Sequence, residues 1–530
     1  EKDAAGMNIT TPRIHVKAGP QHITAAFVQR FEGPVDDLVA PIDYTLADTE
    51  SGDAVGLTAL PHVRDFSITG PFTVTGVSDT PSRRKIFVCR PLSASEEIPC
   101  ARRIVSQLAG QAYRRTPSGE DVESLMTFFA EAGAAGQNHV RDFESGIRAV
   151  VQALLASPQF LFRLEEMPAG ARPGENYRVT DADLASRLSY FLWATGPDAE
   201  LMKAAANGTL HQPAVIEKQV RRMLADARAD ALSTRFASQW LRLQDVDKIK
   251  PDALLYPSFD NTLAESYKRE TELFFNSIVR EDRNILDLLN ADYTFVNERT
   301  AKVYRIPNIT GEELQRVKVE DPNRRGLLGH GSVLMQTSIA DRTSPVLRGK
   351  WIMEVLLGSP PPAPPPNVPP LEDTKSATDS GKTLSVRERM EEHRKNPACA
   401  SCHRVIDPLG LSLDNFDVVG AWRIKDNGVN VDTTGKLYDG TELTGPVSLR
   451  QALLGHSDTI IRNFTDNLLA YALGRRVEYY DQPAVRAIVK KAAQSDYRFS
   501  SFVMGIVNSA AFQMSQSEPA TTTVADRASR

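Results

Sequence analysis

The feature of this sequence that most constrains its fold is a proline-dense run, GSPPPAPPPNVPP, at Gly358–Pro370. Proline fixes its own φ angle and lacks a backbone N–H, so such a run cannot continue a helix or a central strand. It favours the extended polyproline form and acts as a semi-rigid spacer. The segment that follows, LEDTKSATDSGKT, is polar and is expected to be mobile. The run therefore predicts two units, one on either side of it.

The beginning of the chain has the period of β-strands. The segment ITTPRIHVKAGPQHITAAFVQRF alternates apolar and polar residues around a Gly19-Pro20 turn, and HVRDFSITGPFTVTG is broken at Gly70-Pro71. Short alternating runs bounded by glycine and proline are typical of strands. We expect residues 1–85 to form a small β-sandwich-like domain.

From Cys100 onward the apolar period becomes helical. The segment SGEDVESLMTFFAEA opens with a start signal at Ser118 and Asp121, and Thr180 is the expected N-cap of the helix in TDADLASRLSYFLWA. The pattern FESGIRAVVQALLASPQFLFRLEE predicts a long amphipathic helix that is interrupted at Pro158. Most of the chain is therefore expected to be helical.

Composition limits the classes of function. The chain has 530 residues, a net charge of −5 and a pI of about 6.1, whereas a nucleic-acid-binding protein is expected to have a basic surface. No stretch reaches the roughly 18 apolar residues of a membrane span. The first residues, Glu1-Lys2-Asp3, are not a signal peptide, so we expect that a leader has been removed or that this is part of a longer chain.

The chain has 4 cysteines, and two of them lie in the pentapeptide Cys399-Ala400-Ser401-Cys402-His403. This C-x-x-C-H pattern is typical of covalent haem c, because two thiols add to the porphyrin vinyl groups and the next histidine reaches the iron. Three other interpretations remain open: a thioredoxin-like redox pair, half of a zinc site, and coincidence. The segment before the motif looks helical rather than like a βαβ unit, and a zinc site would need two more ligands. We therefore expect one haem c, attached through Cys399 and Cys402 and ligated by His403.

The other two cysteines, Cys89 and Cys100, are then natural partners for each other. We predict a disulfide between them, because haem c is matured outside the cytoplasm, where disulfides persist. The whole pattern predicts a mainly α, multidomain protein with a C-terminal cytochrome c-like haem domain. Its expected parts are a β-rich domain at 1–85, helical domains at 86–170 and 171–320, the Pro-rich linker and haem attachment region at 321–425, a helical domain that completes the haem pocket at 426–516, and a disordered tail at 517–530.

The second axial ligand of the iron is less strongly indicated. An electron carrier commonly has a methionine or histidine there, whereas an enzyme often leaves the position open. Met514, in the segment AAFQM, is nominated first, and His393, six residues before Cys399, is the alternative. The second ring nitrogen of His403 is expected to donate to a carbonyl or a carboxylate, and the region of Pro408, just downstream, is a plausible source of a backbone carbonyl. The glycine-rich segment GLLGHGS lacks the lysine of a phosphate-binding loop and predicts a turn or a close backbone approach.

The segment HRKNPACASCHRVIDPLGLSLDNFDVVGAWR resembles the planctomycete-type cytochrome c proteins, which combine the domains of unknown function 1595, 1592, 1588 and 1585. Further matching segments occur in the expected order: RRKIFVCRP, CARRIVSQLAGQAYRR, LLASPQFLFRLE, LASRLSYFLW, RTSPVLRGKWIMEVLLGSPPPAPPPNVP, LLAYALGRRVEYYD and YRFSSFVMGIVNSAAFQM. The resemblance implies a periplasmic or extracellular haem protein, but it brings no known reaction. Relatives often carry a further N-terminal segment, sometimes with its own C-x-x-C-H. This sequence starts at the expected β-domain, so any such second haem is expected to be absent here or to lie on another polypeptide.

Three functions are consistent with these features. We expect electron transfer, within a larger assembly or with a redox partner protein. A haem-dependent oxidoreductase acting on an extracellular substrate such as a carbohydrate is the second possibility. The third is a structural protein that binds a partner or a glycan and has an appended haem module.

Overall fold

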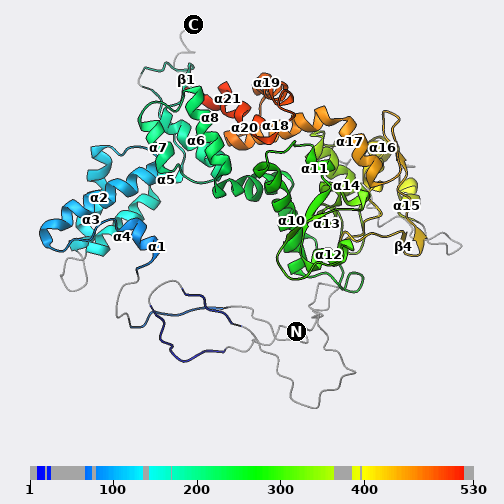
Figure 1. Cartoon of the computed structure of the whole chain (residues 1–530), viewed down its shortest axis with the longest axis horizontal. Coiled ribbons are helices and arrows are strands. Elements are labelled where there is room, and N and C mark those ends of the chain that lie inside the picture. The colour runs from blue at the N-terminus through cyan, green and yellow to red at the C-terminus, as the bar shows by residue number, and fades with distance from the viewer. Residues whose placement is uncertain are drawn as a thin grey trace, which may run out of the picture. The chain divides into compact units, whose positions relative to one another are not determined.

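The computed structural model describes residues 9–17, 21–25, 66–73, 79–134, 143–168, 170–362, 385–393 and 397–517. The chain is mainly helical, as predicted, and it divides into two compact units (Figure 1). Unit 1 holds the described residues up to Arg163, and unit 2 holds those from Leu164 onward.

Unit 1 is a helical bundle whose helices are α1 Pro81–Ile86, α2 Ala94–Tyr113, α3 Gly119–Ala134, α4 Phe143–Ala156 and α5 Pro158–Leu161. Its core lies between α2, α3 and α4 and contains Ile104, Phe129 and Val150, all nearly inaccessible to solvent. Gly146 on α4 lets Phe129 of α3 pack directly on the helix backbone, because a Cβ there would lie 2.5 Å from the ring. Close packing of this kind fixes the spacing of the two helices.

The predicted β-sandwich lies largely outside the described residues. The stretches of it that are described, at 9–17, 21–25 and 66–73, contain no strand. Its predicted end is residue 85, and the structure has a helix, α1, from Pro81 onward. Thr80 accepts a hydrogen bond from the backbone N–H of Arg83, and a proline is favourable in the first turn of a helix, so this segment begins a helix.

Unit 2 contains most of the secondary structure. Its α-helices are α6 Asp181–Trp193, α7 Ala199–Ala206, α8 Pro213–Ala225, α9 Ser238–Trp240, α10 Asn261–Arg280, α11 Asp287–Asn290, α12 Glu298–Tyr304, α13 Gly331–Gln336, α14 Pro345–Trp351, α15 Val386–His393, α16 Pro397–Leu411, α17 Pro446–Gly455, α18 Ser457–Leu473, α19 Gln482–Ala493, α20 Phe499–Val507 and α21 Ala510–Gln513. Short 3-10 or π turns are η1 Ala227–Asp230, η2 Leu232–Ala237, η3 Leu243–Lys248, η4 Pro322–Arg324, η5 Leu327–Gly329, η6 Ile352–Leu356 and η8 Tyr479–Asp481.

The strands that the structure describes in unit 2 form antiparallel pairs. The pairs are β1 Asn176–Arg178 with β8 Met514–Gln516, β2 Tyr293–Val296 with β3 Gln315–Lys318, β4 Lys425–Asp426 with β5 Val429–Asn430, and β6 Gly435–Lys436 with β7 Glu442–Leu443. The first pair brings the end of the described chain back beside the segment that precedes α6.

One continuous apolar core runs through unit 2. Phe464 of α18 lies at its centre and packs edge-on against Phe236 of η2 and Phe502 of α20, with ring centroids 6.1 and 5.2 Å apart. Trp240 donates its indole N–H to the backbone carbonyl of Val355. Segments on both sides of the Pro-rich run therefore share this core, since Leu409 and Phe416 belong to it as well.

Within the part of the chain that the structure describes, no helix is long and apolar enough to cross a bilayer.

Candidate functional site

The C-x-x-C-H motif lies on a single helix, α16, which spans Pro397–Leu411. Cys402 and His403 are half-buried, and the side chain of Cys399 lies outside the described residues. A helix places residues three apart on neighbouring positions of one face. The backbone therefore carries Cys399 and Cys402 on the same side of α16, and His403 follows directly.

The imidazole of His403 is held by a buried carboxylate. His403 Nδ1 lies 2.9 Å from Oδ1 of Asp407, which is one helical turn further along α16. The side chain of Asp407 has no exposed surface, whereas that of His403 keeps 18% of its own. An ionised carboxylate can only accept hydrogen bonds, so Nδ1 is the donor and Nε2 is the nitrogen that would face a metal.

Of the two kinds of acceptor expected for His403, a carbonyl or a carboxylate, the structure has the carboxylate. The nomination of a carbonyl near Pro408 is corrected, because the carbonyl of Pro408 accepts hydrogen bonds from the backbone N–H and the hydroxyl of Ser412. Pro408 lies inside α16, and its carbonyl continues the helical ladder instead of turning toward the histidine. The adjacent residue, Asp407, supplies the acceptor.

Two glycines fix the position of α16 against α14. A Cβ on Gly410 would lie 1.7 Å from the carbonyl oxygen of Pro345, and a Cβ on Gly349 would lie 2.1 Å from that of Ile406. Only glycine permits backbones to approach so closely. The contacts flank Asp407 in the sequence, so the turn of α16 that carries the carboxylate is tightly seated.

The turn that follows α16 is held by a buried arginine. Arg348 of α14 is 1% exposed and donates to the backbone carbonyls of Leu413, Phe416 and Asp417 at 2.6, 2.7 and 3.0 Å. Burial lowers the pKa of Arg348 to about 10, which still leaves the guanidinium charged at neutral pH. Buried backbone carbonyls that lie outside a regular helix or sheet need donors of this kind, because an unpaired one costs free energy. Arg348 is thus structural.

The nominated distal ligands have different placements. Met514 begins β8, opposite Arg178 of β1, and its carbonyl accepts a hydrogen bond from Arg187. Figure 1 shows β1 and α21 at the other end of unit 2 from α16, so the structure does not bring Met514 to His403. His393 ends α15, but its side chain lies outside the described residues. The nearby Met390 of α15 is buried against Leu411 and is part of the packing.

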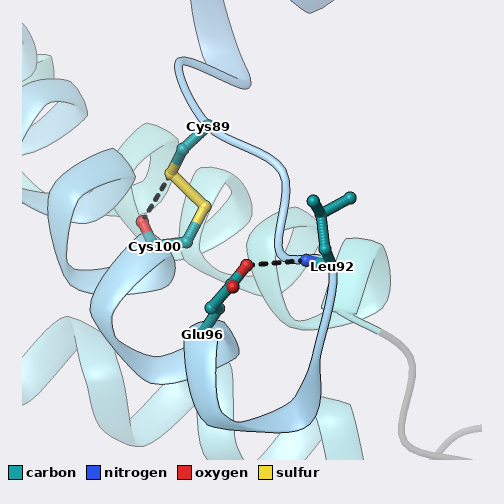
Figure 2. The surroundings of a disulfide bond; sticks show 4 residues. All are labelled: Cys89, Leu92, Glu96 and Cys100. Atoms are coloured by element: carbon teal, nitrogen blue, oxygen red, sulfur yellow. Dashed lines mark hydrogen bonds between the residues drawn. A yellow bond between two sulfur atoms is a disulfide. The ribbon is translucent and has the colours of Figure 1, made fainter.

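The Cys89–Cys100 disulfide is present in unit 1, with Cα atoms 5.8 Å apart. Figure 2 shows that it ties the segment before α2 to the first turns of that helix. The backbone N–H of Leu92 donates to the carboxylate of Glu96 within the closed loop, at 2.9 Å (Figure 2).

A buried polar cluster around Glu270 is the feature that sequence reasoning missed. Glu270 of α10 has no exposed surface, and its two oxygens accept hydrogen bonds from the hydroxyls of Thr294 and Tyr304, each at 2.5 Å. Burial raises its pKa to about 7. His330 is also buried, with Nδ1 3.0 Å from the hydroxyl of Thr271, and burial lowers its pKa to about 3.

This cluster is joined to the chain that follows α16. The hydroxyl of Tyr267, on α10, donates to the carbonyl of Val419 at 2.6 Å, and Arg324 donates to the carbonyl of Gly420 at 2.7 Å. Arg324 also lies over the ring of Tyr304, 4.0 Å from its centroid. The predicted close approach at GLLGHGS is found here, since a Cβ on Gly331 would lie 2.4 Å from the ring of Tyr267. No periodicity or motif marks Glu270, because its partners come from distant segments.

Comparisons with known proteins agree with this arrangement. Four family models match in order along the chain: the proteins of unknown function DUF1595 at residues 100–165, DUF1592 at 179–306, DUF1588 at 324–426 and DUF1585 at 439–512. No curated protein and no solved structure shows significant similarity to the chain.

The match that contains α16 carries the name PSCyt3, and the set of matches indicates a cytochrome-type protein. All four domains of one known family architecture are present, and in the order of that family. The chain belongs to the planctomycete-type cytochrome c family, as its resemblance to that family predicted.

Proposed function

We propose that this chain is an exported monohaem c-type cytochrome that transfers electrons, within a larger assembly or with a redox partner protein. One haem c is attached by thioether bonds to Cys399 and Cys402, and His403 is the proximal ligand of its iron. The bound haem supplies a one-electron Fe(III)/Fe(II) couple. The residues of the chain bind it, orient the imidazole and surround it with protein.

The observation that carries this proposal is the state of His403. It follows Cys402 on the same helix, and Asp407 fixes its ring and its tautomer. Histidines that ligate metals almost always donate the other ring N–H to a carboxylate, a carbonyl or water. A thioredoxin-like redox pair uses only the two cysteines, so it would not need a carboxylate that orients the histidine after them. A zinc site would need ligands beyond those of the motif, and the other two cysteines of the chain are joined in the Cys89–Cys100 disulfide.

The residues around α16 fit a covalently held porphyrin. The helix is seated on α14 by glycine contacts, and Arg348 holds the turn that follows it, so the attachment residues lie on a rigid element. Ile406, Leu409 and Leu411, which follow the motif on α16, are buried, and we expect apolar side chains of this segment to contribute to the surroundings of the haem. Low polarity around a haem is one of the means by which a protein sets the properties of the iron.

Export is supported by the Cys89–Cys100 disulfide in unit 1. Disulfides persist in oxidising compartments, and haem c is generally matured outside the cytoplasm. We therefore place the protein in the periplasm or outside the cell.

The attachment is tested by acid–acetone extraction of the purified protein. We expect haem to stay on the wild-type chain, at one haem per chain by pyridine haemochrome assay, and to be lost in the double variant Cys399→Ala and Cys402→Ala. The matched control is Cys89→Ser with Cys100→Ser, which removes the other two cysteines and should keep the haem. Release of intact haem from the wild type would refute the attachment.

Carbon monoxide distinguishes the electron carrier from the haem-dependent oxidoreductase. A reduced electron carrier with both axial positions filled should not bind carbon monoxide rapidly. We expect its reduced spectrum to be unchanged on addition of the gas. Rapid binding would indicate an open iron site and would favour an oxidoreductase that acts on an extracellular substrate such as a carbohydrate.

A further inference from the structure

We propose that Asp407 is a positioning residue that sets the reduction potential of the haem, and that its carboxylate makes this potential lower than a neutral partner of His403 would. The inference rests on the proposed attachment of haem at Cys399, Cys402 and His403. It concerns a contact within the chain itself, the hydrogen bond between His403 Nδ1 and Asp407 Oδ1.

The contact is built to be strong. Its length is 2.9 Å, and both residues lie on α16 four positions apart, so the helix itself sets their spacing. Asp407 is fully buried, with 0% of its side chain exposed. Water therefore screens the carboxylate poorly, and a charge-assisted hydrogen bond in such surroundings is stronger than one between neutral groups.

The carboxylate is also prevented from withdrawing. The carbonyl of Ile406, one residue earlier, is in contact with Gly349 of α14, and Gly410, three residues later, is in contact with Pro345. A shift of this turn toward α14 would drive backbone atoms of the two helices together. Close packing around the supporting residue is what keeps a ligand in one orientation.

An anionic acceptor changes the ligand more than a carbonyl does. It draws the Nδ1 proton toward itself, which raises the basicity of the imidazole and its donation to a metal at Nε2. The ferric iron carries one more positive charge than the ferrous iron, so it gains more from a more basic ligand. The oxidised form is stabilised, and the potential falls.

The test is a spectroelectrochemical redox titration of the full-length holoprotein and of Asp407→Asn. Asparagine can still accept the N–H through its amide oxygen, but it carries no charge. Substitution of a residue that supports a metal ligand typically changes metal affinity or activity by 10–100-fold. We expect the equilibrium constant for reduction to rise at least about tenfold, which for a one-electron couple moves the potential upward by about 59 mV.

Two further variants complete the design. Asp407→Glu retains a carboxylate and should return the potential most of the way to the wild-type value, which a purely structural role would not predict. Asp458→Asn removes an exposed carboxylate from α18 of the same unit and should leave the potential close to that of the wild type. If Asp407→Asn fails to fold, Asp407→Ser removes the charge with a smaller side chain and should raise the potential in the same direction.

Equal potentials for the wild type and for whichever neutral variant, Asn or Ser, retains haem would overturn the role of Asp407. A fall in potential would overturn it as well. The failure of the attachment itself is a separate result, because it would appear as loss of haem from the wild type during acid–acetone extraction, before any variant is compared.

Discussion

Replacing Glu270 by glutamine should change how the stability of unit 2 depends on pH. Glu270 is fully buried, and burial raises its pKa to about 7 from the ordinary 4.5 of a glutamic acid. Between these two values the folded protein keeps the proton while the unfolded chain loses it. The resulting stabilisation is fully present below pH 4.5 and is lost as the pH rises through 7. The difference in pKa corresponds to about 3 kcal/mol of unfolding free energy.

Glutamine cannot titrate, so the Glu270→Gln variant does not lose this part of its unfolding free energy as the pH rises. Its amide oxygen can accept from Tyr304, and its NH₂ group can donate to the hydroxyl of Thr294, so the two existing contacts are retained. Relative to the wild type, the variant should become more stable by most of that 3 kcal/mol between pH 5 and pH 9. His330, which stays neutral in the folded state, contributes the same background to both proteins.

The assay is guanidinium unfolding followed by tryptophan fluorescence at pH 5 and pH 9. All 4 tryptophans of the chain, Trp193, Trp240, Trp351 and Trp422, lie in unit 2, so the signal reports this unit alone. The matched control is Glu320→Gln, whose side chain is 79% exposed and should give the same difference from the wild type at both values of pH. A Glu270→Gln difference that does not change between pH 5 and pH 9 would refute the reasoning.

Three further outcomes are expected. Cys89→Ser with Cys100→Ser should lower the stability of unit 1 by about 3 kcal/mol, because the disulfide closes a short loop. Limited proteolysis should then cut unit 1 faster, while the unfolding of unit 2 followed by tryptophan fluorescence should be unchanged. Gly410→Ala should destabilise unit 2 by about 1–3 kcal/mol or more in the same fluorescence assay, since the new Cβ would lie 1.7 Å from a carbonyl oxygen of α14, whereas Gly455→Ala has open space and should be tolerated. His330→Gln should lose less stability on acidification than the wild type in that assay. The pKa of His330 is about 3 in the folded protein and 6.5 in the unfolded chain, so the wild type loses the stabilisation from the neutral imidazole as the pH falls below 6.5. An unchanged acid dependence would contradict this.

Local features of the fold could be predicted because their signals lie close together in the sequence. Thr180 caps α6 and accepts from the backbone N–H of Asp183, as expected. Ser118 and Asp121 exchange hydrogen bonds at the start of α3. The predicted break at Pro158 is the boundary between α4 and α5. In each case a side chain meets backbone groups within a few residues, so the chain path elsewhere does not matter.

Features that depend on distant partners could not be predicted in this way. The apolar period around Met514 is compatible with many positions in the fold, and the pairing of β8 with β1 is what carries this residue away from α16. Asp407 lies four residues after His403, so its spacing was visible in the sequence. The choice between its carboxylate and the carbonyl of Pro408 depended on whether the helix continues through the proline, and the structure shows that it does.

The same distant contacts bear on the reading in which the haem-bearing segment is an appended module. Such a module would meet the rest of the protein through a small polar surface. Instead, Phe416 and Leu409 belong to the continuous core of unit 2. In the interior of the unit, Tyr267 and Arg324 donate hydrogen bonds to backbone carbonyls of the segment that follows α16. Arg348, which lies before the Pro-rich run, is buried and donates to backbone carbonyls of the turn that follows α16. Removing the segment would expose this core and leave Arg348 without its three carbonyl acceptors, so the large helical unit and the proposed haem site are expected to fold and act as one structure.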